Sequence, residues 1–328
     1  MQLRNKHLQK TLDELDYLKK LYRKEFAIQK PGFDKEYDKR LRNLKRDLFE
    51  KINVDVDKAA NRIEIKQLVG RPMKDRILLT KLHLVQQILD LTNRDMESFS
   101  LMFALTGNET FSYKTIERAY EDQLVGMILH NLYVMSCGVP REIDASSDGT
   151  GYSLTITKHY RTDKDENKEH WEEVERKEYI ITSTITDLKT KLYVSFATGF
   201  QSEMRLFEQA KCWLEKRGFT LNSLTLDKYY SNQKTIAGFN ENTKLYFLPK
   251  KNATIRGCKK WKKSIQKFTT NTIDYLKHYY KRETNEYCHS ADKRRFGVIR
   301  QKKKCRIITA METRMTLHNY ITTILHPT

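Results

Sequence analysis

The chain has 328 residues, of which 39% are hydrophobic and 31% are charged, and its formal net charge at pH 7 is +19. No apolar run approaches the roughly 20 residues that a membrane-spanning helix needs, and the charged N-terminus lacks the apolar segment of a secretory signal, so we expect a cytoplasmic protein outside the membrane. The five cysteines are scattered without a Cys-x-x-Cys pair, which argues against a disulfide framework and a structural zinc site.

The first 138 residues have the pattern of an all-helical region. Leucines near the N-terminus recur at helical spacing, and the stretches 74–92 and 112–135 each predict one helix, the second with Ser112 as its N-cap. The segment 101–111 between them contains a glycine and predicts a break. Helix, glycine-containing turn and helix fit a helix-turn-helix DNA reader and an ordinary helical bundle alike, so the pattern leaves both open.

The pattern changes near residue 138, where glycine, proline and turn residues predict a domain boundary. Alternating β-branched and aromatic residues after it predict strands, with a turn at Asp187. The predicted elements are a strand over 152–160, two strands over 176–200, an amphipathic helix that begins near residue 202 and stops at Gly218, a short strand ending at Asp227, a strand over 243–252 and a long helical region. Strands with helices packed against them predict an α/β domain with a mixed sheet.

Positive charge is concentrated in one block of the sequence. Between residues 249 and 306 there are 19 Lys and Arg against 4 Asp and Glu. Short charge runs are usually a solvated face, but a block of this size favours a nucleic-acid partner. Aromatic residues interleaved with the charges either stack on bases or fill a core. The lysines that we expect on the DNA backbone are Lys259, Lys260, Lys262 and Lys263.

Two aspartates occupy similar settings. Asp148 stands just ahead of Gly-Thr-Gly, and Asp227 follows "LNSLTL", so each lies at or just past the end of a predicted strand. A turn or capping role is the ordinary interpretation, because Asp-Gly is a strong turn dipeptide. Ligands also gather beyond strand ends in open α/β sheets. Both aspartates therefore fit metal ligands as well, with the glycines turning the chain away from Asp148.

A third carboxylate stands in a stripe of polar residues. Tyr279, Arg282, Glu286 and Lys293 are separated by two, three and six residues. At 3.6 residues per turn these positions share one side of a helix. A solvated face with an ion pair between Arg282 and Glu286 is the ordinary interpretation. Glu283 and Glu312 compete for the role of third carboxylate, and only Glu286 fits the whole stripe.

The spacing Tyr-(2)-Arg-(3)-Glu-(6)-Lys resembles the signature around the catalytic glutamate in one large group of DDE transposases of prokaryotic insertion sequences. "DGTG" and "LTLDKYYSN" resemble the two aspartate motifs of that family, and the order also matches, with 78 residues between Asp148 and Asp227 and 58 between Asp227 and Glu286. The resemblance covers about residues 140–320. It implies an RNase H-like catalytic domain over 139–328, after a helical DNA-binding or assembly region over 1–138. The 58 residues are too few for the large β insertion that some members carry.

The resemblance also implies the chemistry of the site. Asp148, Asp227 and Glu286 would be the catalytic residues and would hold two Mg²⁺ ions, for which Mn²⁺ can substitute. Hard cations prefer such carboxylate oxygens. Two divalent cations held close together support phosphodiester cleavage. The residues that the resemblance places against DNA are Tyr279, Arg282, Lys293 and Arg294.

The implied function is a DNA transposase. It would bind the terminal inverted repeats of its element, cleave to expose 3′-hydroxyls and join them to target DNA, as a homodimer or larger assembly on double-stranded DNA in the nucleoid. Three alternatives stay open: a domesticated or inactive relative that binds DNA, a nuclease that cuts without joining, and a helical DNA-binding regulator whose α/β domain only mediates assembly. A covalent tyrosine mechanism would not need the two aspartates.

Overall fold

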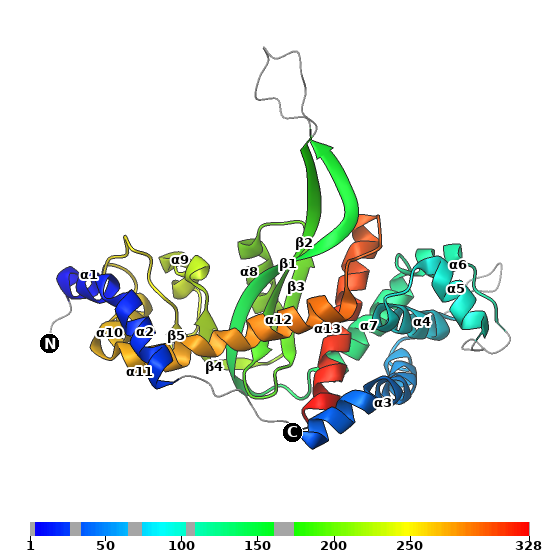
Figure 1. The fold of residues 1–328 in the computed structure, drawn as a ribbon, viewed down its shortest axis with the longest axis horizontal. Helices are drawn as coiled ribbons and strands as arrows, with labels where there is room; N and C mark the ends of the chain where they lie inside the picture. Colours follow the sequence, from blue (N-terminus) through cyan, green and yellow to red (C-terminus); the bar gives the residue numbers. More distant parts are fainter. Residues whose placement is uncertain (1–3, 27–33, 65–73, 103–108, 161–173, 328) are drawn as a thin grey trace, which may run out of the picture.

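The structure is a computed structural model that describes residues 4–26, 34–64, 74–102, 109–160 and 174–327. A five-stranded sheet lies in the middle of the molecule, and helices gather at both of its ends (Figure 1). Among the described residues, no helix has the length and apolar content to cross a membrane.

The sheet has the strand order β3-β2-β1-β4-β5. The first three strands along the chain are antiparallel to one another, while β4 runs parallel to β1 and β5 runs parallel to β4, so the predicted mixed sheet is confirmed. The outer parts of β1 and β2 project from the sheet as a two-stranded arm (Figure 1). The strands are β1 (Glu142–Tyr160), β2 (Val174–Asp187), β3 (Tyr193–Gly199), β4 (Thr220–Leu226) and β5 (Lys244–Tyr246).

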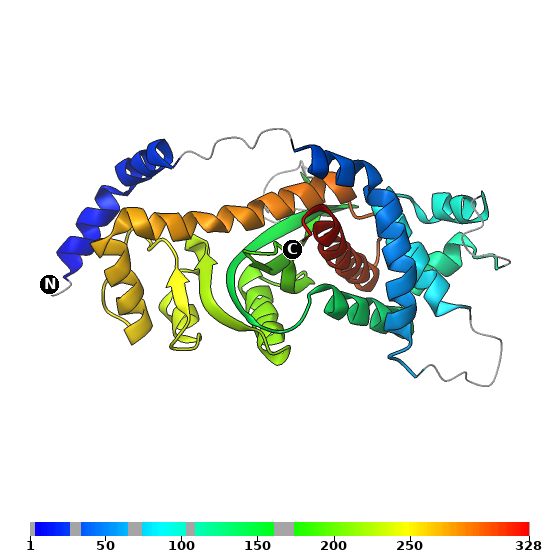
Figure 2. The same cartoon turned by 90° about the horizontal axis from the view of Figure 1, so that it is seen from below.

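Helices cover both faces of the sheet. On one face lies α8 (Glu203–Lys216), whose buried Leu206, Phe207, Ala210 and Leu214 follow helical spacing. On the other face α11 (Thr272–Tyr279), the short 3₁₀ turn η2 (Tyr280–Arg282) and α12 (Glu283–Phe296) form a nearly continuous rod (Figure 2). The remaining elements near this rod are η1 (Lys228–Tyr230), α9 (Gln233–Ala237) and α10 (Lys259–Thr270).

The N-terminal region is helical, as the sequence predicts. Its first two helices lie beside α10 and α11, where Leu8 and Leu15 join the core that α8 and the sheet share. Its other helices form a second core with α13 (Lys304–Leu325) at the opposite end of the molecule. The helices of this region are α1 (Asn5–Asp13), α2 (Leu15–Glu25), α3 (Lys35–Ala60), α4 (Arg76–Leu89), α5 (Asn93–Met102), α6 (Tyr113–Ala119) and α7 (Gln123–Ser136).

The prediction of one helix over 112–135 is wrong. Ser112 caps α6 as expected, accepting a hydrogen bond from Thr115 N at 3.3 Å. The helix then ends at Ala119. Asp122 caps the following helix, α7, and its side chain accepts hydrogen bonds from the backbone N–H groups of Leu124 and Val125. The predicted break over 101–111 follows α5, but residues 103–108 lie outside the described residues, so the helix-turn-helix question stays open.

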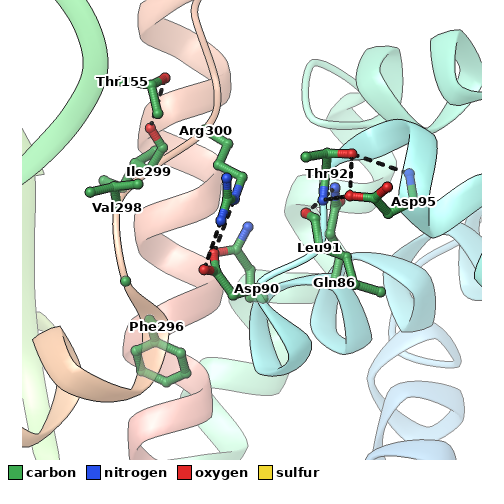
Figure 3. A network of polar contacts seen from close by, with 12 residues as sticks. Gln86, Asp90, Leu91, Thr92, Asp95, Thr155, Phe296, Val298, Ile299 and Arg300 are labelled. Atoms are coloured by element: carbon green, nitrogen blue, oxygen red, sulfur yellow. Dashed lines mark hydrogen bonds and ion pairs between the residues drawn. The ribbon is translucent and has the colours of Figure 1, made fainter.

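The segment between α12 and α13 is held from three sides. Ile299 pairs with β1 through Ser153 and Thr155, and Arg300 forms a double contact with Asp90 at 2.9 and 3.2 Å (Figure 3). The buried guanidinium of Arg314 donates to the carbonyl groups of three consecutive residues, Phe296, Gly297 and Val298. The exit of α12 is therefore fixed to the sheet, to α4 and to α13.

Candidate active site

Asp148 lies inside β1, so the turn predicted at this position is wrong. The parallel partner β4 ends at Leu226, opposite Ser147. Asp148 therefore stands where β1 loses that neighbour, and Asp227 is the first residue after β4. The following glycine does not turn the chain. A Cβ atom on Gly149 would lie 2.4 Å from Glu203 Cδ, so the lack of a side chain at position 149 leaves room for the Glu203 side chain against the strand.

Asp227 is held at the start of η1, where its side chain accepts a hydrogen bond from Tyr229 N at 3.3 Å. The next turn is anchored by Tyr230, which is fully buried and donates to Glu203 Oε1 at 2.6 Å. The end of β4, the start of α8 and the strand at Gly149 are thus tied together beside the two aspartates. Tyr230 belongs to the segment "LTLDKYYSN", whereas no sequence pattern points to Glu203.

Glu286 reaches the aspartates through Arg282. One guanidinium nitrogen of Arg282 lies 2.5 Å from Glu286 Oε1 and 3.6 Å from Asp227 Oδ1. The ion pair expected between Arg282 and Glu286 is present, and it extends to Asp227. Asp148 and Glu286 line one open pocket together with Lys293 and Arg294. Carboxylates and cations from β1, the end of β4, η2 and α12 therefore meet where β4 ends beside β1.

The charge state of Asp148 reflects these neighbours. Burial and then the carboxylate of Asp227 raise the pKa of Asp148 from 3.8 to about 7, and Glu286 adds to the increase. The N–H of Gly149, 3.0 Å from Asp148 Oδ1, and the charge of Arg282 oppose it. A carboxyl group whose ionised form is disfavoured by burial and by like charge is stabilised by a nearby cation.

The three carboxylates supply the oxygen donors that a hard divalent cation prefers. Over the residues that the structure describes, no three His, Cys, Asp or Glu side chains stand close enough together to hold a metal ion. The guanidinium of Arg282 is the cation that links Asp227 and Glu286. The donor set therefore fits a metal by its chemistry, and a metal would compete with Arg282 for these carboxylates.

The competing glutamates point elsewhere. Burial and then the charge of Glu283 raise the pKa of Tyr22 on α2, and Glu283 is not among the residues that line the pocket of Asp148 and Glu286. Glu312 lines a different pocket, formed by α7, α8 and β3. Among the three glutamates weighed from the sequence, Glu286 is the one that shares a pocket with Asp148.

The predicted DNA contacts fall into two groups. Tyr279 is 3% exposed, with the guanidinium of Arg282 5.3 Å above its ring, so its ring supports Arg282 and is not open to solvent. Lys260 contacts the carbonyl oxygen of Asn240. The side chains of Lys259, Lys262, Lys263, Lys293 and Arg294 are exposed. The aromatic residues of the basic block mostly fill the core, since Trp261, Phe268, Tyr275, Tyr279 and Phe296 are buried.

The buried side of α12 carries polar residues that the sequence analysis did not single out. Asn285, His289 and Asp292 are at most 4% exposed. Their spacing of four and three residues places them on one side of the helix. This spacing is visible in the sequence and indicates a polar side of the helix.

The chain resembles a known protein over most of its length. The chain is 37% identical over 306 residues to a protein of Archaeoglobus fulgidus described as a probable transposase for insertion sequence element ISA1214, and the match covers 92% of this chain and 91% of the relative. No protein-family model matches the chain.

Proposed function

Because the chain belongs to the family of its archaeal relative, the insertion-sequence transposases, we propose that it is a DDE transposase with an RNase H-like catalytic domain. The sheet supports this fold, since three antiparallel strands are followed by two parallel ones with helices on both faces. Residues 139–328 would form the catalytic domain, and the helical residues 1–138 would serve DNA binding and assembly.

One observation carries the proposal. A half-buried carboxyl with a raised pKa, Asp148, lies beside two further carboxylates that one arginine links. Buried and charged groups with perturbed pKa values gather at functional sites, and these three come from distant parts of a chain in a transposase family. The arrangement supports catalysis by Asp148, Asp227 and Glu286, with Mg²⁺ or Mn²⁺ as cofactor.

The side chains of the site have distinct tasks in this proposal. The three carboxylates would hold two divalent cations, which when bound supply Lewis-acid stabilisation of charge on the scissile phosphate. Arg282 has a planar guanidinium suited to a phosphate. Lys293 and Arg294 line the same pocket and would hold the DNA backbone there. The substrates would be the terminal inverted repeats of the element and a target duplex.

The two steps of the proposed reaction share this site. In cleavage, water would attack the phosphodiester at each element end and displace the 3′-oxygen, which leaves as a 3′-hydroxyl. In joining, that hydroxyl would lose its proton and attack a phosphodiester of the target, and the 3′-oxygen of the target strand would leave and take up a proton. Joining two ends needs both to be held at once, so a homodimer or a larger assembly on DNA forms part of the proposal. A nuclease-only relative would perform the first step alone, and a DNA-binding regulator would perform neither.

The test is cleavage and joining of labelled linear DNA that carries the element ends, with Mg²⁺ or Mn²⁺. We expect Asp148→Ala, Asp227→Ala and Glu286→Gln to bind DNA and to lose both steps. Glu283→Gln and Glu312→Gln are the matched controls and should keep both. Activity in Glu286→Gln would refute the assignment of the third carboxylate. Cleavage without joining by the wild type would favour a nuclease, and DNA binding with neither step would favour a regulator or an inactive relative.

A further inference from the structure

The side of α12 that packs on the sheet makes hydrogen bonds where a packed helix ordinarily presents apolar side chains. Asn285 is fully buried and directly precedes Glu286. Its Oδ1 accepts hydrogen bonds from the hydroxyls of Thr184 and Thr186, at 3.0 and 2.6 Å. Its Nδ2 donates to the carbonyl oxygen of Ser146, at 3.4 Å. One amide therefore joins the helix to two strands.

The three residues that bond to Asn285 are close neighbours of Asp148 in the pairing of β1 with β2. Thr184 is the residue directly opposite Asp148, and Thr186 is directly opposite Ser146. Residues two apart on a strand, and residues directly opposite each other, lie on the same face of a sheet. Asp148 and the groups that hold Asn285 thus belong to one small patch of the sheet. Thr184 is thus both the strand partner of Asp148 and a hydrogen-bond partner of Asn285, which directly precedes Glu286.

We propose that Asn285 is a positioning residue that sets the Glu286 carboxylate against Asp148. Hydrogen bonds fix this register more strictly than apolar packing does, because a shifted helix would leave the buried amide and both hydroxyls without partners. The inference rests on the proposed function, since it matters only if the two carboxylates hold a metal together. Groups that orient metal ligands typically change metal affinity by about 10–100-fold when they are removed.

Asn319 provides a matched control. It is also fully buried, and its amide accepts from Tyr193 N at 2.8 Å and donates to Tyr193 O at 3.0 Å and Ser136 Oγ at 3.1 Å. It lies on α13 and makes these bonds to β3 and α7, away from the carboxylates. Asn319→Ala therefore removes a buried amide of the same type without touching the link to Glu286.

The experiment is a calorimetric titration of the full chain with Mn²⁺ alone, alongside thermal unfolding of each variant. We expect Asn285→Ala to bind Mn²⁺ about 10-fold or more weakly, and Asn319→Ala to bind it as the wild type does despite a similar loss of thermal stability. Asn285→Leu preserves the side-chain volume and should show the same weakening, which covers the case that the alanine variant does not fold.

Two results would overturn the inference: unchanged Mn²⁺ affinity in the Asn285 variants, or equal weakening in Asn319→Ala. Failure of the proposed function has a different signature. In that case the wild type and Asp148→Ala would give the same Mn²⁺ titration, whatever the residue at position 285.

Discussion

Arg282 occupies the place in the site where charge is most concentrated. It contacts both Asp227 and Glu286, and its Nε is buried without a hydrogen-bond partner among the described residues. Its guanidinium therefore balances two carboxylates, and in the proposed function it also contacts a phosphate of the DNA. Removing Arg282 should therefore not weaken metal binding, because a competing cation is lost, but it should impair catalysis, because a phosphate contact is lost.

We expect Arg282→Ala to reduce DNA cleavage by about 10²-fold, the usual effect of removing one group that stabilises developing charge. The Mg²⁺ concentration for half-maximal cleavage should not rise, because the competing cation is gone. Steady-state cleavage at a series of Mg²⁺ concentrations measures both. Arg42→Ala removes an exposed Arg–Asp pair of the same i,i+4 type on α3 and should leave both values unchanged. A raised Mg²⁺ requirement in Arg282→Ala would contradict the competition.

His318 and Asp292 form a buried charged pair behind α12. Burial lowers the pKa of His318, but the carboxylate of Asp292, 2.9 Å from Nδ1, outweighs burial and raises it to about 10. Tyr193 donates to the other oxygen of Asp292 at 2.8 Å and stacks on the His318 ring. The nearby His289 has its pKa lowered to about 4 by burial, so at neutral pH it adds no positive charge.

The sign of the pH effect follows from that raised pKa. The folded chain keeps a proton on His318 that the unfolded chain releases near pH 6.5. The stabilisation is complete below pH 6.5 and is lost as the pH rises through about 10. We expect the free energy of unfolding, measured with denaturant, to fall between these pH values. The double variant His318→Gln/Asp292→Asn should lack this part of the decrease, and an equal decrease in that variant would exclude the pair as its source.

Removing one member alone should be worse than removing both. His318→Gln leaves Asp292 buried and charged without its closest cation, with Arg295 3.8 Å away as the remaining one. Breaking a buried ion pair by removing one partner typically costs about 3–5 kcal/mol, and Arg295 should reduce that cost. The double variant should recover part of that loss at pH 7. Chemical denaturation of the two single variants and the double variant gives the coupling energy of the pair directly.

At the scale of elements, the sequence correctly predicts the features that depend on residues close together in the chain. The helix now labelled α8 was predicted from its apolar spacing and from Gly218, which has a φ of +78° as a helix end requires. The turn at Asp187 and the short strand before Asp227 are also where the sequence predicts them. The block between Asp227 and Glu286 contains the single short strand β5 and helices, which agrees with the prediction that no β domain is inserted there.

The errors at this scale arose where tertiary contacts override local preference. Asp-Gly at position 148 predicts a turn, but pairing with β2 on one side carries the strand straight through it. The close approach at Gly149 is made by Glu203, 54 positions further along the chain, and no local pattern shows it. Of the site, the carboxylates and Arg282 were recognisable from spacing, whereas Asn285, Glu203 and Tyr230 depend on which strands become neighbours.

The end of α12 provides a test of backbone geometry. Gly297 has φ +59° and ψ −151°, a conformation nearly restricted to glycine, and a Cβ there would lie 3.0 Å from Asp90 Oδ2. We expect Gly297→Ala to lower the free energy of unfolding by about 1–3 kcal/mol. Gly126 lies inside α7 with nothing within 4 Å of an added Cβ, so Gly126→Ala should raise it by about 0.5–1 kcal/mol. Denaturant titration of both variants checks the opposite signs.

At the scale of the whole molecule, the basic block exposes most of its lysines and buries most of its aromatic rings. Trp261 and Phe268 on α10 are buried, while Lys259, Lys262 and Lys263 on the same helix are exposed. Stacking on bases needs accessible rings, so among the residues of α10 the lysines are the groups available to DNA. Contacts of lysines with phosphates carry little sequence information, and we therefore expect α10 to bind DNA by charge alone.

This expectation sets the salt dependence of binding. Each lysine–phosphate contact on duplex DNA contributes about 0.9 to the slope of log affinity against log salt concentration. The variant Lys259→Gln/Lys262→Gln/Lys263→Gln should therefore lose up to about 2.7 from that slope and weaken similarly on element-end and unrelated DNA. Fluorescence anisotropy over a salt series measures both. Lys189→Gln/Lys216→Gln, in the β2–β3 turn and at the end of α8, should keep the wild-type slope. A loss confined to element-end DNA would instead mean that α10 reads sequence, because release of counterions from the backbone does not distinguish one duplex from another.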